Sequence, residues 1–175
     1  MKKQNLWTLA VLLFLASCQL LQPARDTSYR TLPSEEETEL PPDDTAPPAP
    51  VLTVNFESTQ KFEAVLAKSV REHKPVFIDF YATWCGPCKL MDERVYTSKP
   101  TIEYLNESFV NYKVDTDSDL GKQLSGQYSV TALPTLLFVD GNGNILIRKE
   151  GAAFHSELVE LGDKALNLFN RQQEN

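Results

Sequence analysis

Apolar and polar positions along the chain predict regular structure from about Val51 onward. The run 76–81 is almost continuously apolar, which is typical of a central strand buried on both faces of a sheet. Ahead of it, Phe62, Val65, Leu66 and Val70 follow helical spacing, so a helix is expected there.

Shorter patterns complete the prediction. Ser58 or Thr59 is expected to cap the first helix, and the sequence 140–143, Asp-Gly-Asn-Gly, signals a hairpin between two strands. The remaining expected strands are 51–56, 109–114, 135–140 and 144–149, and the remaining helices run from Cys85 to about Val95, shortly after Pro100, over 120–128 and over 156–170. The order βαβαβαββα predicts an α/β fold with a mixed sheet.

The N-terminal residues follow a different pattern. Lys2 and Lys3 precede an 11-residue apolar run, 6–16, which is too short to span a bilayer and indicates an export signal. The run ends in Leu-Ala-Ser-Cys18, which resembles the lipobox of bacterial lipoproteins. The resemblance implies a signal peptide over 1–17 and a lipid on Cys18. A plain signal peptide cleaved nearby, with Cys18 incidental, is the alternative.

Composition separates the next segment from the rest. Residues 19–50 hold seven of the eleven prolines, seven acidic residues, no glycine and one aromatic residue, Tyr29. Such a stretch buries too little apolar surface to offset its chain entropy. We therefore expect 18–50 to be a lipidated cysteine followed by a disordered tether, reaching at most on the order of 100 Å, and 51–175 to be one domain. Partner binding by the tether is an alternative.

The net charge and the numbers of cysteines and histidines argue against some classes of function. The net charge of -7 offers no cationic surface for phosphates, so we expect no nucleic-acid partner. With three cysteines and two histidines, we expect no protein metal site. Nothing in the sequence indicates obligate oligomerisation, and a monomer is expected.

The candidate chemistry lies in Cys85-Gly86-Pro87-Cys88, where the buried strand gives way to a helix. A cysteine at a helix N-terminus is stabilised as a thiolate, and a two-residue spacer lets the second cysteine resolve a mixed disulfide. Half of a zinc site is one alternative, although only His73 and His155 remain as other imidazole or sulfur ligands. A purely structural disulfide is another alternative.

The stretch from Asp79 to Lys89, Asp-Phe-Tyr-Ala-Thr-Trp-Cys-Gly-Pro-Cys-Lys, resembles the active site of the thioredoxin family. Further matching segments are 113–117, Leu133-Pro134-Thr135 and Gly151-Ala152. The resemblance covers about 56–170 and implies the thioredoxin fold, a mixed central sheet with helices on both faces. The helix after Cys88 lacks the proline that kinks it in cytosolic thioredoxins, so the chain is more similar to the C-terminal domains of DsbD-type disulfide reductases.

Residues expected to lie around the cysteine pair can be given roles in proton transfer and in substrate docking. Asp79 is the only charge in its strand, and burial would raise its pKa and suit it to accept a proton from Cys88; facing solvent is the alternative. By resemblance, Lys113 would lie near Asp79, although an ordinary exposed lysine is an alternative. The resemblance also implies a cis Pro134 and a docking surface, with core packing as the alternative, made by Trp84, Gly86, Pro87, Leu133, Gly151 and Ala152.

We therefore expect an exported, membrane-tethered thiol-disulfide oxidoreductase in the bacterial cell envelope. Cys85 would attack disulfides of protein substrates, Cys88 would resolve the intermediate, and no bound cofactor would be needed. The Gly86-Pro87 pair resembles reducing thioredoxins, which implies a transmembrane thiol donor as partner. The alternatives are a disulfide oxidase or isomerase, and a non-catalytic binding module.

Overall fold

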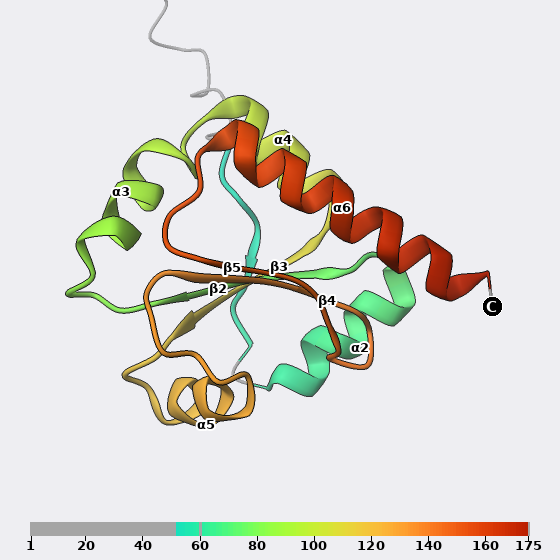
Figure 1. Ribbon diagram of the computed structural model, residues 1–175, viewed down its shortest axis with the longest axis horizontal. Helices are drawn as coiled ribbons and strands as arrows, with labels where there is room; N and C mark the ends of the chain where they lie inside the picture. Colours follow the sequence, from blue (N-terminus) through green and yellow to red (C-terminus); the bar gives the residue numbers. More distant parts are fainter. Residues whose placement is uncertain (1–51, 60, 175) are drawn as a thin grey trace, which may run out of the picture. The chain divides into compact units, whose positions relative to one another are not determined.

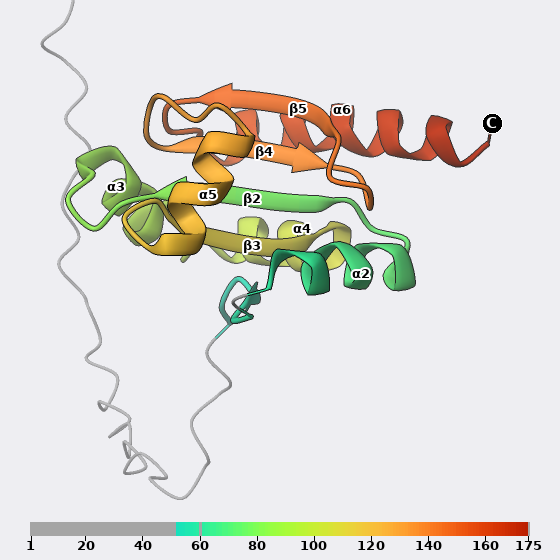
Figure 2. The ribbon, with the colours of Figure 1, turned by 90° about the horizontal axis from the view of Figure 1, so that it is seen from below.

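The sheet is built around strand β2 (Val76–Tyr81), whose first five residues are buried. On one side β2 pairs in parallel with β3 (Val110–Asp115), which pairs in parallel with the two-residue β1 (Phe56–Glu57). On the other side β2 pairs antiparallel with β4 (Thr135–Val139), followed by β5 (Ile145–Glu150). The strand order is β1-β3-β2-β4-β5, and Figure 2 shows β2 between β3 and β4.

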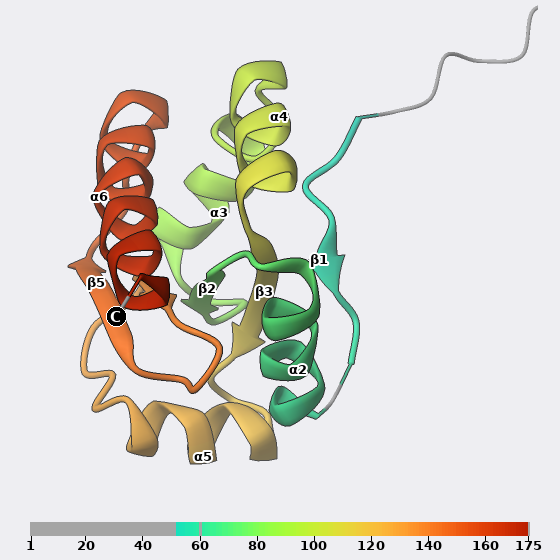
Figure 3. The same cartoon turned by 90° about the vertical axis from the view of Figure 1, so that its right-hand side faces the viewer.

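Helices cover both faces of this sheet. One face carries α2 (Phe62–Glu72) and α5 (Asp119–Gln127), and the other carries α3 (Gly86–Arg94), α4 (Lys99–Ser108) and α6 (His155–Gln173) (Figures 1 and 3). The predicted α/β architecture with a mixed sheet is confirmed.

This computed structural model describes residues 52–59 and 61–174, which fall in the unit Pro48–Asn175. The predicted export signal, the lipid site at Cys18 and the tether lie outside the described residues. In the part of the chain that is described, no helix has both the length and the apolar character that crossing a membrane requires.

The alternation of side chains along β2 assigns each residue to one core. Val76, Ile78 and Phe80 pack in the cluster beneath α2 and α5, which includes Phe62 and Leu124. Phe77 belongs instead to the cluster shared by α3, α4 and α6. Because successive strand residues point to opposite faces, Asp79 points to the same face as Phe77. The acid is thereby directed toward the side of the sheet that α3 covers.

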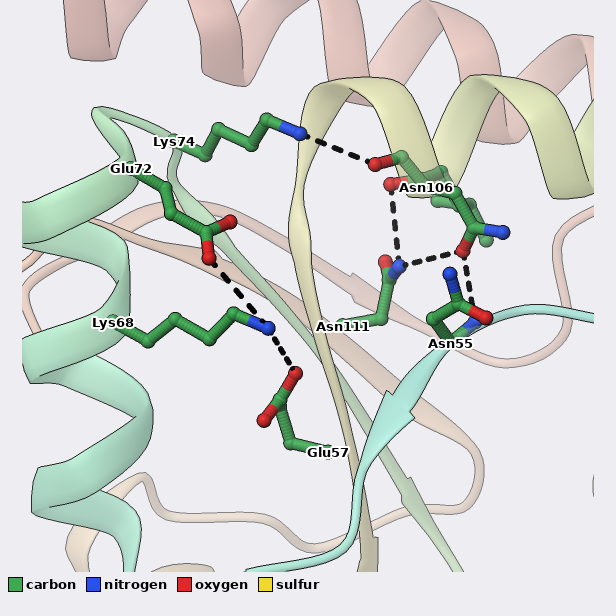
Figure 4. Close-up of polar contacts among 8 residues, drawn as sticks. Asn55, Glu57, Lys68, Glu72, Lys74, Asn106 and Asn111 are labelled. Carbon is green, nitrogen blue, oxygen red and sulfur yellow. Dashed lines mark hydrogen bonds and ion pairs between the residues drawn. The ribbon is translucent and has the colours of Figure 1, made fainter.

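The predicted strand 51–56 is wrong in position, since only Phe56 and Glu57 pair with β3. The side-chain amide of Asn106 takes the place of a neighbouring strand. Its Nδ2 donates to the Thr53 carbonyl at 2.8 Å. Its Oδ1 accepts the Asn55 N–H at 2.8 Å (Figure 4). We call residues 53–57 the strap. This one side chain satisfies the Thr53 carbonyl and the Asn55 N–H, two backbone groups that do not pair with β3.

Polar contacts also hold the end of the strap. Lys68 on α2 donates to Glu57 at 2.6 Å and lies 3.6 Å from Glu72 (Figure 4). The predicted helix cap is wrong, because the N-cap residue of α2 is Lys61 and no side chain caps it. Thr59 Oγ1 instead accepts the Lys61 N–H. The other elements that were predicted with bounds match the observed ones to within three residues at each end, and the helix predicted after Pro100 begins at Lys99.

Candidate active site

Cys85 and Cys88 lie at the start of α3 and form a disulfide, so the structure shows the oxidised pair. Cys85 is the N-cap residue, and its Sγ accepts the Cys88 N–H at 3.2 Å. Both residues are buried, at 4% and 2% exposure, and pack with Ala82, Tyr81 and Leu133. In the reduced form, unpaired N–H groups of the helix N-terminus would stabilise a thiolate at Cys85.

No group of three or more histidine, cysteine or acidic side chains that could hold a metal ion occurs in residues 52–59 and 61–174. The two sulfurs that a zinc half-site would use are bonded to each other. The local geometry is that of a dithiol–disulfide pair.

The loop opposite the cysteines contains the cis Leu133–Pro134 peptide bond, as expected. Leu133 packs against the cysteine pair, and the Pro134 carbonyl accepts the Gly151 N–H at 2.8 Å. Gly151 has a φ of 84°, in the left-handed region that favours glycine. This hydrogen bond ties the loop after β5 to the cis-proline loop.

A groove of about 530 Å³ runs beside Cys85 and contains four of the residues expected to dock substrates, Trp84, Gly86, Pro87 and Leu133. Gly151 and Ala152 do not line it; Ala152 packs against the core instead. The sequence did not identify the rest of its lining, which comprises Thr116, Lys122, Ser125, Val130, Thr131 and Ala132.

Trp84 projects into solvent at the edge of this groove. It is 68% exposed, yet its Nε1 donates to Asp117 Oδ2 at 2.9 Å. Asp117 follows β3 in the chain, so residues from two loops fix the orientation of the indole. An exposed aromatic ring held in one orientation is a suitable contact for an apolar substrate segment.

Asp79 is buried, at 1% exposure, so the solvent-facing alternative is wrong. Tyr96 donates to its Oδ2 at 3.0 Å, and Lys113 Nζ lies 3.8 Å from the same oxygen. Oδ1 has no hydrogen-bond partner among the described protein groups. Burial raises the pKa of Asp79 to about 6, while Lys113 and Tyr96 act in the opposite direction. The acid can therefore exchange a proton near neutral pH.

Lys113 is largely buried, with 18% of its side chain exposed, so the exposed-lysine alternative is also wrong. It lies directly opposite Asp79 in the parallel register of β2 and β3, and it forms an ion pair and hydrogen bond with Asp92 on α3. Its ammonium lies 4.6 Å from the centre of the Tyr81 ring and 5.3 Å from that of Tyr96. Two carboxylates and aromatic faces together compensate the buried cation.

Sequence reasoning missed two residues around this acid. Asp92 was detectable, because it lies four residues after Cys88 and therefore on the same face of α3. Tyr96 was not, because it follows the end of α3 and its position depends on a turn in which its N–H donates to the Met91 carbonyl.

The described geometry agrees with comparisons to known proteins. The model of the family described as Thioredoxin matches residues 53–164. The chain is 37% identical over 118 residues to the chloroplastic thioredoxin Y2 of Arabidopsis thaliana, covering 67% of this chain and 66% of that protein. It is 40% identical over 79 residues to a thioredoxin of Borreliella burgdorferi, covering 43% and 60%. The chain thus spans less than two thirds of the length of these relatives.

Solved structures of two other proteins are similar to this chain in fold. A candidate disulphide isomerase from Bacteroides thetaiotaomicron is similar with a TM-score of 0.57 and 36% identity, covering 66% of this chain and 97% of that one. The oxidised C-terminal domain of DsbD from Neisseria meningitidis is similar with a TM-score of 0.52, covering 63% and 97%. At 24% identity, the DsbD comparison concerns the fold alone.

Proposed function

This chain belongs to the thioredoxin family and has its fold, and from that premise we propose that it catalyses thiol–disulfide exchange on protein substrates. The observation that carries the proposal is the Cys85–Cys88 pair at the N-terminus of α3, packed against Leu133 of the cis-proline loop. A groove of about 530 Å³ lies beside this pair, and a purely structural disulfide would not require one.

The proposed reaction moves two electrons. The Cys85 thiolate attacks one sulfur of a substrate disulfide, forming a mixed disulfide and releasing the other substrate sulfur as a thiolate that takes up a proton. The Cys88 thiol loses its proton, and its sulfur attacks Cys85 Sγ. The Cys85–Cys88 disulfide forms, the second substrate thiolate leaves and is protonated, and the substrate is reduced.

Asp79 is the proposed acceptor of the Cys88 proton. A carboxyl with a pKa of about 6 is partly to largely ionised in the neutral range, and a base works best when its pKa is near the working pH. The Lys113 ammonium lowers the pKa of Asp79 and so limits its rise, whereas Asp92, the ion-pair partner of Lys113, raises that pKa. Asp79 is thus a base only because both burial and this cation act on it.

We place the substrate in the groove between Trp84 and the cis-proline loop. An extended peptide there would pair with backbone groups of the loop, and its side chains would contact Trp84, Pro87 and Leu133. Recognition through backbone groups and apolar contacts favours unfolded or extended disulfide-containing segments over one specific surface.

The proposed direction is reduction. The Gly86-Pro87 pair between the cysteines resembles reducing thioredoxins, and a reductase outside the cytoplasm needs electrons from a transmembrane thiol donor. We further propose that Cys18 carries the lipid that holds the domain at the membrane of a bacterial cell envelope, facing away from the cytoplasm.

Trapping the intermediate tests the exchange reaction. Cys88→Ser removes the resolving sulfur, so reduced C88S mixed with a disulfide-bonded peptide should accumulate a mixed disulfide at Cys85, visible as a mass increase equal to one peptide half. Cys85→Ser is the matched control and should accumulate far less adduct. Equal adduct in both variants, or none in either, would overturn the proposal.

A further inference from the structure

The two oxygens of Asp79 have different surroundings. Oδ2 accepts a hydrogen bond from the Tyr96 hydroxyl at 3.0 Å and lies 3.8 Å from Lys113 Nζ. Oδ1, on the same carboxyl, is buried and has no hydrogen-bond partner among the described protein groups. A buried carboxyl oxygen without a partner is costly, so this asymmetry needs a reason.

Resting on the proposed function, we propose that Tyr96 is a positioning residue for proton transfer: its hydrogen bond to Oδ2 holds the Asp79 carboxyl in one orientation and leaves Oδ1 as the oxygen that takes and releases the proton. Tyr96 touches neither cysteine in this scheme. It acts through Asp79 alone.

The surroundings of Tyr96 suit such a role. The residue is 7% exposed, and its ring packs edge-on against Phe56 at 5.3 Å and Phe77 at 6.4 Å between centroids. Packing from the strap and from β2 therefore fixes the ring. Burial and the adjacent Asp79 raise the pKa of the phenol well above its usual value, so it keeps its proton throughout. Tyr96 is thus a permanent donor.

Every charged or titratable group facing Asp79 contributes to this arrangement. Lys113 of β3 approaches Oδ2 as a charge and forms its hydrogen bond with Asp92 of α3. Tyr81 of β2 lies under the lysine, 4.6 Å from its ammonium. Among the described residues, Tyr96 is therefore the one whose side chain donates a hydrogen bond of about 3 Å to the Asp79 carboxylate, whereas Lys113 lies 3.8 Å away.

The proton step balances without another reactant. The S–H bond of Cys88 breaks and an O–H bond forms at Oδ1, so that the thiol becomes a thiolate and the carboxylate becomes a neutral acid. Oδ2 keeps the Tyr96 hydrogen bond before and after the transfer. The proton later leaves Oδ1 for solvent, which restores the carboxylate for the next turnover.

Tyr96→Phe in the full chain tests the inference, because it removes one oxygen atom and keeps the ring. The first readout is the titration of the Asp79 carboxyl, followed by NMR on protein with ¹³C-labelled aspartate. The Tyr96 hydrogen bond stabilises the ionised form, so its loss should raise the pKa of Asp79 above about 6. The second readout is the pH profile of single-turnover peptide reduction, whose midpoint should move upward with the pKa. Well below the midpoint, the rate should fall about tenfold for each unit of the shift, and at high pH it should approach the unmodified protein's rate.

Tyr104→Phe is the matched control. Tyr104 is also a hydrogen-bonded tyrosine, but its hydroxyl contacts Val159 and Asp163 on α6, away from Asp79. This control should leave both readouts unchanged. An Asp79 pKa that stays the same or falls in Y96F, or an equal shift in Y104F, would overturn the inference.

A second comparison separates positioning from general damage to the fold. In an Asp79→Asn background no carboxylate remains, so adding Tyr96→Phe should not change the pH profile further. An added effect there would show that Tyr96 does not act through Asp79. The NMR titration does not depend on activity. If C88S trapped no peptide while the Asp79 pKa still shifted in Y96F, the proposed function would fail but the hydrogen-bond geometry would stand.

Discussion

At the residue scale, the properties of Asp79 follow from its position on β2. The same carboxyl on the surface would have an ordinary pKa, whereas burial under α3 raises it to about 6 and the nearby Lys113 limits the rise. Ionising such a buried carboxyl lowers the free energy of unfolding of the protein. Such a cost agrees with the proposed role of Asp79 as a base.

Asp79→Asn should stabilise the domain near neutral pH and not in acid. The folded pKa of about 6 lies above the ordinary value of 3.8, so the folded state loses stability as pH rises through this interval. Converted at about 1.4 kcal/mol per unit, the penalty above pH 6 is about 3 kcal/mol, and D79N should recover up to that amount at pH 7.5.

Urea unfolding at pH 7.5 and pH 4 measures this difference. Asp119→Asn, an exposed acid in the first turn of α5, is the control and should change stability by less than about 1 kcal/mol. A D79N variant that is no more stable than the parent at pH 7.5 would show that the buried acid carries no such penalty.

Asp79 could be identified from the sequence because it is the only charged residue in an apolar strand. The cysteines could be identified because their spacing forms a known motif. Lys113 was placed only by family resemblance; the parallel register Asp79↔Lys113 is what brings the two together. Tyr96 was unpredictable because its approach to Asp79 depends on the turn after α3.

At the element scale, α5 contains two glycines in opposite situations. A Cβ on Gly121 would overlap the backbone carbonyl of Asp115 at the end of β3, whereas a Cβ on Gly126 would meet nothing within 4 Å. Gly121 is thus required by the close approach of α5 to β3, and Gly126 is not. The helix can lie this close to the strand only where a side chain is missing.

Gly121→Ala should therefore destabilise the domain by about 1–3 kcal/mol, the usual cost of overpacking. Gly126→Ala, in the same helix, should stabilise it by about 0.5–1 kcal/mol because alanine favours helical structure. Thermal unfolding of the two variants provides the comparison. Similar changes in both would mean that α5 does not approach β3 as described.

The strap is a second feature at this scale. Its contacts with Asn106 join residues more than fifty positions apart in sequence, so the pattern at 51–56 predicted a strand but could not reveal the side chain that replaces its neighbour. Phe56 of the strap packs on Tyr96 and lies 5.7 Å from Lys113 Nζ. The strap thus packs against the side chains that surround Asp79.

Asn106→Ala should destabilise the domain by about 1–3 kcal/mol, because it leaves backbone groups of Thr53 and Asn55 without partners. The Asn55 amide should also exchange its hydrogen faster. Asn170→Ala, at an exposed position of α6, is the control and should change stability by less than about 0.5 kcal/mol. Unchanged protection of the Asn55 amide in N106A would contradict the described role of Asn106.

At the scale of the whole molecule, we propose that a thiol–disulfide exchange domain is held at a membrane by a tether. The fold and the cysteine pair were predictable because helical and strand patterns and one motif specify them. The lining of the groove by α5 and its following loop was not, because it depends on how these segments pack beside Cys85.

Cys18→Ser should release the protein from the membrane. With lipid on Cys18, the full chain expressed in a bacterium should sediment with membranes and incorporate labelled palmitate, since acyl chains bind the bilayer at about 0.8 kcal/mol per buried CH₂. The C18S protein should become soluble and unlabelled. Equal membrane association of both forms would rule out lipid anchoring at Cys18.

The reduction potential of the Cys85–Cys88 pair tests the proposed reductase most directly. Equilibrating the full chain with glutathione buffers, followed by thiol alkylation, measures it. We expect a value near that of thioredoxin, about -270 mV, at which the dithiol gives electrons to substrate disulfides. A value near about -120 mV, that of a strong oxidant, would contradict the proposed direction and assign the protein to disulfide formation.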